Sequence, residues 1–193
     1  MMISLAEFEI ALRGLLRLAR FDAGFAGFFD LSKEGAKRSF RLALPLLPFY
    51  LLLLNLNAPW PPDVDLLRIG AAELIGYATM WTTFPLIMIL GARLLSREDR
   101  VYGAIAVYNW ISVLWIALQL PVELATYYGL DPDWGFKITV ALLLFTLACE
   151  FFAFKRLINA GIEVTIALVA LDFILSQFVI APLFDAMARA PLF

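Results

Sequence analysis

The most regular pattern in this sequence is a series of long apolar segments separated by short polar ones. The central segment, Tyr102–Glu123, has roughly 20 residues without a lysine or arginine, enough for a helix to cross a bilayer. On a helical projection its polar side chains share one side, and these are Tyr102, Asn109, Ser112, Gln119 and Glu123. Because a polar group facing lipid is costly, we expect other helices to cover this side.

Four further apolar segments have the length of a membrane-spanning helix, and they run from about Phe40 to Asn57, Leu66 to Leu95, Trp134 to Phe154 and Ile162 to Phe184. The chain of 193 residues is 63% hydrophobic with a mean hydropathy of +0.85, which is too apolar for an ordinary soluble domain. We therefore expect an all-α fold, a polytopic integral membrane helical bundle. Its five transmembrane helices would occupy residues 40–184, between a cytoplasmic amphipathic segment, 1–39, and a short outer tail, 185–193.

Local signals indicate where these helices begin and bend. Pro45 and Pro48 predict a kink or a late start in the first span, and Pro85 predicts a kink in the second. Trp60, in the proline-rich loop between them, suits the headgroup region. Expected helix caps are Asp63 or Asp65 for the second span, Ser96 with Asp99 for the third and Asp133 for the fourth.

The first 20 residues predict an amphipathic helix that begins with a capping box, Ser4 with Glu7. A basic amphipathic helix is typical of the membrane interface, although it can also pack on its own bundle or bind a partner. The phenylalanines that follow it, from Phe21 to Phe29, fit an interfacial linker. The apolar face comprises Leu5, Phe8, Leu12, Leu15, Leu16 and Ala19, opposite Glu7, Glu9, Arg13, Arg17 and Arg20. The expected membrane-surface residues are Leu5, Phe8, Leu12, Leu16, Arg13, Arg17 and Arg20, with anionic lipid as their partner.

The basic residues alternate between the two sides of the predicted bundle. Counted loop by loop, twelve of the 15 lysines and arginines fall on one side and three on the other. Cytoplasmic loops carry the excess of basic residues, so we expect a cytoplasmic N-terminus and an outer C-terminus in the bacterial inner membrane.

Two other spans also carry polar side chains on one side. Thr139, Thr146 and Glu150 share a side of the fourth, and Asp172 lies near the middle of the fifth. A carboxylate at that depth is costly unless it is neutral, paired or hydrated. Asp172 either exchanges protons or cations, or hydrogen-bonds to Ser112, Gln119 or another polar-face residue to fix helix packing. The candidate intramembrane polar site comprises Asp172, Thr165, Ser176, Asn109, Ser112, Gln119, Glu123, Glu150 and Thr146.

The other carboxyl groups have structural explanations as well. Glu150 lies near the cytoplasmic end, where Arg93, Arg97 or Arg156 could form an ion pair with it. Glu73 and Glu123 both lie near the outer end. As neighbours they could bind a cation, and otherwise they would contact interfacial water.

Several kinds of chemistry are excluded by composition. The chain has no histidine and one cysteine, Cys149, so Ser-His, Cys-His and Cys-based zinc sites cannot form. We expect no catalytic residue, no metal site and no cofactor, and nothing supports nucleic-acid binding.

Two segments, RVYGAIAVYNWISVLWIALQLP and FKRLINAGIEVTIALVAL, stand where the Yip1-type membrane family has its third span and its fourth-to-fifth connection. With five spans and short loops, residues 40 to 180 resemble that family. The resemblance implies a non-enzymatic protein of membrane organisation or partner recruitment.

Two functions follow from these patterns. The first is a non-enzymatic membrane scaffold or accessory protein that engages the cytoplasmic leaflet and contacts partner membrane proteins or copies of itself. The alternative is a small transporter or channel with a polar intramembrane path around Asp172. A wet cavity beside Asp172 would favour transport, and a dry, fully paired polar face would favour the scaffold.

Overall fold

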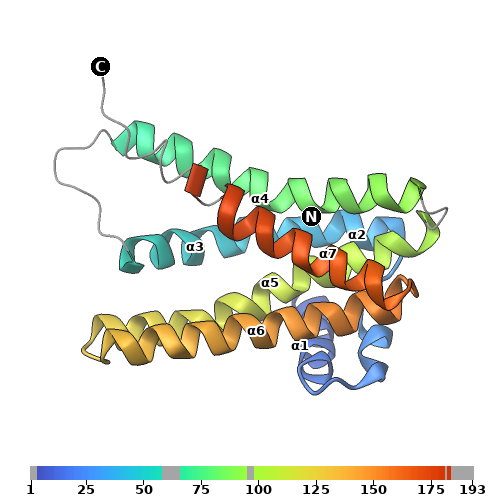
Figure 1. Cartoon of the computed structure of the whole chain (residues 1–193), viewed down its shortest axis with the longest axis horizontal. Helices are drawn as coiled ribbons and strands as arrows, with labels where there is room; N and C mark the ends of the chain where they lie inside the picture. The colour runs from blue at the N-terminus through green and yellow to red at the C-terminus, as the bar shows by residue number, and fades with distance from the viewer. Residues whose placement is uncertain (1–3, 58–65, 95–97, 181, 184–193) are drawn as a thin grey trace.

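The computed structural model describes residues 4–57, 66–94, 98–180 and 182–183. These residues are helical apart from short turns and include no β-strand, so the predicted all-α class is confirmed. The short elements η1 and η2 are 3-10 helices, whereas η3 is a π-helix that continues α7. In chain order the elements are α1 (Leu5–Leu18), η1 (Ala23–Phe28), α2 (Lys33–Ser39), η2 (Phe40–Leu42), α3 (Ala43–Asn57), α4 (Leu66–Leu94), α5 (Glu98–Tyr127), α6 (Pro132–Leu157), α7 (Ile162–Ile174) and η3 (Leu175–Ile180) (Figure 1).

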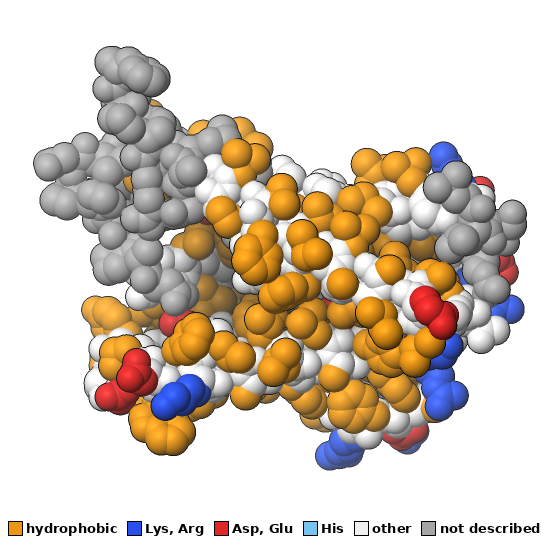
Figure 2. All heavy atoms as spheres, viewed as in Figure 1, with side chains coloured by type: hydrophobic (Ala, Val, Ile, Leu, Met, Phe, Trp, Pro, Cys, Tyr) orange, Lys and Arg blue, Asp and Glu red, His pale blue; other side chains and the backbone are white. Residues whose placement is uncertain are grey.

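Five stretches of helix in the described residues are long and apolar enough to cross a membrane, as predicted. Their outer side chains are largely hydrophobic: Figure 2 shows an apolar surface over the face that carries α7, where Ile166, Ile174 and Phe178 are exposed. Such a surface suits hydrocarbon rather than water. The five stretches are Lys33–Leu56, Ile69–Arg93, Glu98–Tyr127, Pro132–Leu157 and Ile162–Ile180.

Two predicted helix starts were wrong. The first span begins at Lys33 rather than Phe40, because the Ser32 hydroxyl caps α2 by accepting a hydrogen bond from the Gly35 amide at 3.1 Å. The prolines do not delay the helix, which instead tightens into η2 just before α3. The cap of α6 is Asp131, not Asp133, since Pro132 occupies the first helical position, where its missing amide costs nothing. The expected features at Trp60, Asp63, Asp65 and Ser96 lie outside the described residues.

Helix α5 occupies the centre of the bundle. It packs against α1, α2, α3, α4 and α6, and Figure 1 shows it running between the α3–α4 pair and α6. In an apolar stretch of 18 residues within this span, 50% of the residues are buried in the protein, compared with 6% in the corresponding stretch of the Ile162–Ile180 span. Its buried run of small and β-branched side chains, Ala104 to Val107, allows this close approach of neighbours. The central role expected of Tyr102–Glu123 is confirmed.

The N-terminal segment packs on the bundle through part of its predicted apolar face. Ala11, Leu15 and Leu18 of α1 are buried, and the Phe8 ring lies 5.7 Å from the Trp110 ring of α5. By contrast Leu5, Leu12 and Leu16 are exposed, at 90%, 37% and 57%. Of the predicted apolar face only Leu15 is buried, and Ala11 and Leu18, which the prediction left out, complete the contact with α5 and α6. Leu5, Leu12 and Leu16 form an exposed apolar ridge, which we call the α1 ridge.

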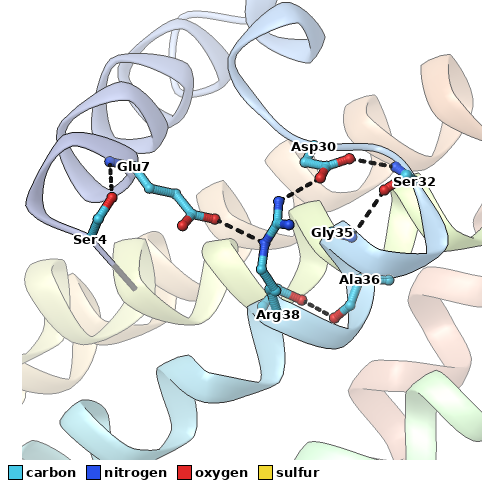
Figure 3. Close-up of polar contacts among 8 residues, drawn as sticks. Ser4, Glu7, Asp30, Ser32, Gly35, Ala36 and Arg38 are labelled. Carbon is cyan, nitrogen blue, oxygen red and sulfur yellow. Dashed lines mark hydrogen bonds and ion pairs between the residues drawn. The ribbon is translucent and has the colours of Figure 1, made fainter. Parts of the chain in front are cut away.

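Arg38 of α2 connects α1 to the rest of the chain (Figure 3). Its Nη2 lies 2.5 Å from Oδ2 of Asp30, and its Nε lies 3.6 Å from Oε1 of Glu7 in α1. Hydrogen bonds from Ser32, followed by the charge of Arg38, lower the pKa of Asp30 below its ordinary value. This cluster holds the turn before α2 against α1.

Glycine makes that turn possible at one position. A Cβ atom on Gly35 would overlap the backbone oxygen of Asp30. The Asp30 backbone cannot move away freely, because its carboxylate is held by Ser32 and Arg38.

Candidate functional site

A partly open cavity of about 670 Å³ lies between α3, α4, α5, α6 and the α7–η3 helix. This volume is within the usual range for small-molecule sites, which is roughly 300 to 1,000 Å³. Three helices each bring a carboxyl group to its wall: Glu73 from α4, Glu150 from α6 and Asp172 from α7. No lysine or arginine is among the described residues that line it.

Asp172 is held by a residue of α5. The Tyr108 hydroxyl donates a hydrogen bond of 2.7 Å to Oδ1 of Asp172. The sequence predicted a partner such as Ser112 or Gln119, and this was wrong. Tyr108 precedes Asn109 and borders the polar side of α5. Its hydroxyl could therefore have been considered as a donor, but tyrosine was grouped with the apolar residues of the helix. The bond joins the peripheral α7 to the central helix.

Glu150 lies deep in the protein beside this pair. Its side chain is 3% exposed, and its Oε1 has no hydrogen-bond partner among the described residues. Glu150, Asp172 and Tyr108 line the same cavity. A buried polar atom without a partner is costly, which makes Glu150 an unusual residue for a purely structural role.

The ion pair predicted for Glu150 is absent from the described residues. Arg93 instead pairs with Glu98 at 3.9 Å, and the Arg156 guanidinium lies 5.5 Å from the Phe152 ring centroid. Both arginines are exposed, whereas Glu150 is buried. Arg97, the third predicted partner, lies outside the described residues.

Asn109 of α5 is a buried residue beside the cavity. Its Nδ2 donates to the Ser39 hydroxyl at 2.9 Å, and that hydroxyl in turn donates to the Ala36 carbonyl. The Asn109 Oδ1 atom is buried and has no partner in the described part of the chain. Asn109 therefore ties α5 to α2 through one end of its amide and lines the cavity.

The far end of the cavity contains the third carboxyl group. The Tyr50 hydroxyl of α3 donates to Oε2 of Glu73 at 3.1 Å, and the Tyr77 hydroxyl donates to the Ala43 carbonyl at 2.7 Å. Glu73 lines the cavity, whereas Glu123 does not and is bonded to Gln119. The two glutamates thus have separate partners.

The structure divides the predicted polar site. Gln119 forms a separate cluster outside the cavity, where its Nε2 donates to Glu123 and to the Thr139 hydroxyl. Thr165 is buried away from the cavity and donates to the Gly161 carbonyl at 3.0 Å. The predicted residues that the cavity brings together are Asp172, Glu150, Asn109, Ser112, Thr146 and Ser176.

Sequence reasoning missed the tyrosines of the cavity, Tyr50, Tyr77 and Tyr108, as well as Gln177 of η3. A hint was available for Tyr77, which lies on the small and polar side of α4 with Gly76 and Glu73. The π-helical turn that brings Gln177 to the wall has no such signal in the sequence.

In the described part of the chain, no group of three or more histidine, cysteine or acidic side chains is arranged to hold a metal ion. The cavity therefore offers separate carboxyl groups along an aromatic wall. Comparisons with family models, with curated proteins and with solved structures found no match to this chain.

Proposed function

We propose that this chain is a small membrane transport protein whose intramembrane cavity takes up protons or cations. The observation that carries the proposal is the pair of carboxyl groups, Glu150 and Asp172, that two different helices bring to the wall of one cavity. Ionisable residues inside a membrane that face a cavity are by default candidates for ion or proton paths. The cavity shifts the balance from the scaffold, which the sequence favoured, to transport.

The residues of the wall have distinct roles in this proposal. Asp172 and Glu150 supply the negative charge that a proton or cation neutralises. Tyr108 positions Asp172 through its hydrogen bond and keeps it turned toward α5. Because α7 is the least buried of the candidate spans, its movement offers a route for opening the cavity.

Ion flux into vesicles tests the proposal. Purified protein in liposomes should carry protons, or sodium or potassium ions, down a gradient faster than empty liposomes. Asp172→Asn and Glu150→Gln should each abolish this flux, because only a carboxyl group can exchange the charge. Glu163→Gln is the matched control, since Glu163 is an exposed carboxylate on the same helix as Asp172. The absence of flux under every gradient, with folded protein present, contradicts the proposal.

The orientation is a further part of the proposal and rests on the basic residues. With the N-terminus cytoplasmic, the end that carries α1, α2 and the α4–α5 connection faces the cytoplasm. Exposed Tyr127, Tyr128 and Trp134 then lie at the outer headgroup boundary, which suits aromatic side chains. In a Cys149→Ala background, a cysteine at Glu98 should react only from inside and one at Asp131 only from outside.

The scaffold function remains a second candidate because of the α1 ridge. Leu5, Leu12 and Leu16 are exposed beside Arg13, which fits insertion into an anionic leaflet. This surface would also serve a transporter as an anchor. Copurification of a partner at fixed stoichiometry, without flux, would favour the scaffold. The resemblance to the Yip1-type family stays a prediction, and it points the same way.

A further inference from the structure

The chemical class of the cavity's ligand follows from its wall, if the cavity is a transport site as proposed above. Charge is the first criterion. The lining has three carboxyl groups and, among its described residues, no basic side chain to balance them. An anionic ligand would find no basic partner here, whereas a cation can be paired with a carboxyl group of the wall.

Aromatic rings form the second criterion. The Tyr50 and Tyr77 ring centroids are 4.8 Å apart, and the Tyr77 and Trp81 centroids are 6.0 Å apart. The Phe84 and Tyr108 centroids are 5.0 Å apart, and Tyr108 bonds to Asp172. Aromatic side chains thus extend from the Glu73 end of the cavity to the Asp172 end. Ring faces attract organic cations, most strongly when the site is shielded from water.

Size is the third criterion, and it separates an organic cation from a metal ion. A bound metal ion needs several oxygen ligands within about 2.0 to 2.6 Å. The described acidic residues form no such group, and a cavity of about 670 Å³ is far larger than one ion. A hydrophobic organic cation of drug size would fill this volume and cover its apolar wall.

We propose that the cavity is a binding site for a hydrophobic organic cation, such as an aromatic or quaternary ammonium or phosphonium compound. Its charge lies beside Glu150 and Asp172, and its apolar groups lie against Tyr77, Trp81 and Phe84.

Two probes of the same shape and opposite charge test the assignment. Tetraphenylphosphonium should bind the purified full-length protein in detergent at one site per chain in a calorimetric or equilibrium-dialysis titration. Tetraphenylborate should not show saturable binding at this stoichiometry. Glu150→Gln and Asp172→Asn should each weaken tetraphenylphosphonium binding at least about tenfold, since each removes a carboxyl group that can pair with the bound cation. Trp81→Leu should weaken it about 3- to 30-fold, as expected for one ring face.

Controls separate this result from nonspecific partition and from misfolding. Glu163→Gln should bind like wild type. Ser112→Trp should block binding by filling the cavity with every carboxyl group intact, which keeps the test valid if an acidic variant misfolds. Equal binding of both probes, or equal loss in Glu163→Gln and Glu150→Gln, overturns the assignment.

The ligand class and the proposed function can fail separately. Proton or metal-ion flux that depends on Asp172, without tetraphenylphosphonium binding, would reject the ligand class and keep the transport function. Saturable binding that depends on Glu150, without flux of any ion or of the probe itself, would keep the site and reject transport.

Discussion

Gly35→Ala should destabilise the bundle, because the added methyl group would overlap the backbone oxygen of Asp30. Overlaps of this kind typically cost about 1–3 kcal/mol when the neighbour cannot move. Here the neighbour is main chain, and the Asp30 carboxylate is fixed by the Ser32 amide at 3.0 Å and by Arg38 at 2.5 Å.

Two smaller terms adjust this magnitude. Alanine is a better helix former than glycine by up to about 1 kcal/mol, which acts in the opposite direction. If the turn moves, the contact between Arg38 and Asp30 is lost, but both side chains are 40% exposed, so this adds less than about 1 kcal/mol. The net expectation is a loss of about 1–3 kcal/mol, and for a chain of this length each kcal/mol lowers Tm by about 2–4 °C.

The assay is thermal unfolding of the purified protein in detergent, followed by near-UV circular dichroism. Gly70→Ala and Gly91→Ala are matched controls, since a Cβ at either helical position meets no atom within 4 Å. Both should be neutral or slightly stabilising. If Gly35→Ala unfolds at the same temperature as these controls, the close approach of Asp30 is not a constraint and the reasoning is refuted.

Three other perturbations give separate expectations. The fold lowers the pKa of Asp30, so the stabilisation by this carboxylate is fully present above about pH 4 and is lost as pH falls through the lowered pKa. The difference in Tm between wild type and Asp30→Asn should therefore disappear on acidification. Tyr108→Phe should lower the free energy of unfolding in detergent by only about 0.6–1.7 kcal/mol, the range measured for hydrogen bonds between membrane helices. It should nevertheless alter the pH profile of flux, because Asp172 loses its hydrogen-bond donor, and an unchanged profile would exclude a positioning role for Tyr108. The double substitution Leu12→Asp and Leu16→Asp in the full chain should reduce contact of the α1 ridge with anionic lipid. The measurement is quenching of a fluorophore on α1 by labelled lipid headgroups, and unchanged quenching would contradict a lipid contact at the ridge.

Periodicity and length were sufficient for the coarse fold. An apolar window of about 20 residues has few alternatives to a membrane helix, so the five spans could be counted from the sequence. The centrality of α5 also followed, because a polar side on an otherwise apolar helix requires neighbours to cover it. Such arguments depend on one helix at a time.

The site depended on pairs of helices, which a single sequence does not specify. Tyr108 and Asp172 are 64 positions apart, and their contact is set by the rotation and tilt of α7 against α5. Glu150 illustrates the same limit: Arg156 follows it by six positions in α6, but Glu150 is buried and Arg156 is exposed. The buried half of α1 could not be foreseen for the same reason, since amphipathicity does not distinguish lipid from a neighbouring helix.

The central position of α5 also constrains the order in which the protein can assemble during synthesis. Helices α1, α2, α3 and α4 all precede α5 in the chain, and each packs against it. The two earlier spans are therefore synthesised before their common neighbour, so the faces that α5 covers have no partner until it follows. Helix α6 then packs on α5, and last in the chain α7 packs on α6 while its continuation η3 packs on α4. The carboxyl group of Asp172 is thus the final one to reach the cavity, when its tyrosine partner is already in place.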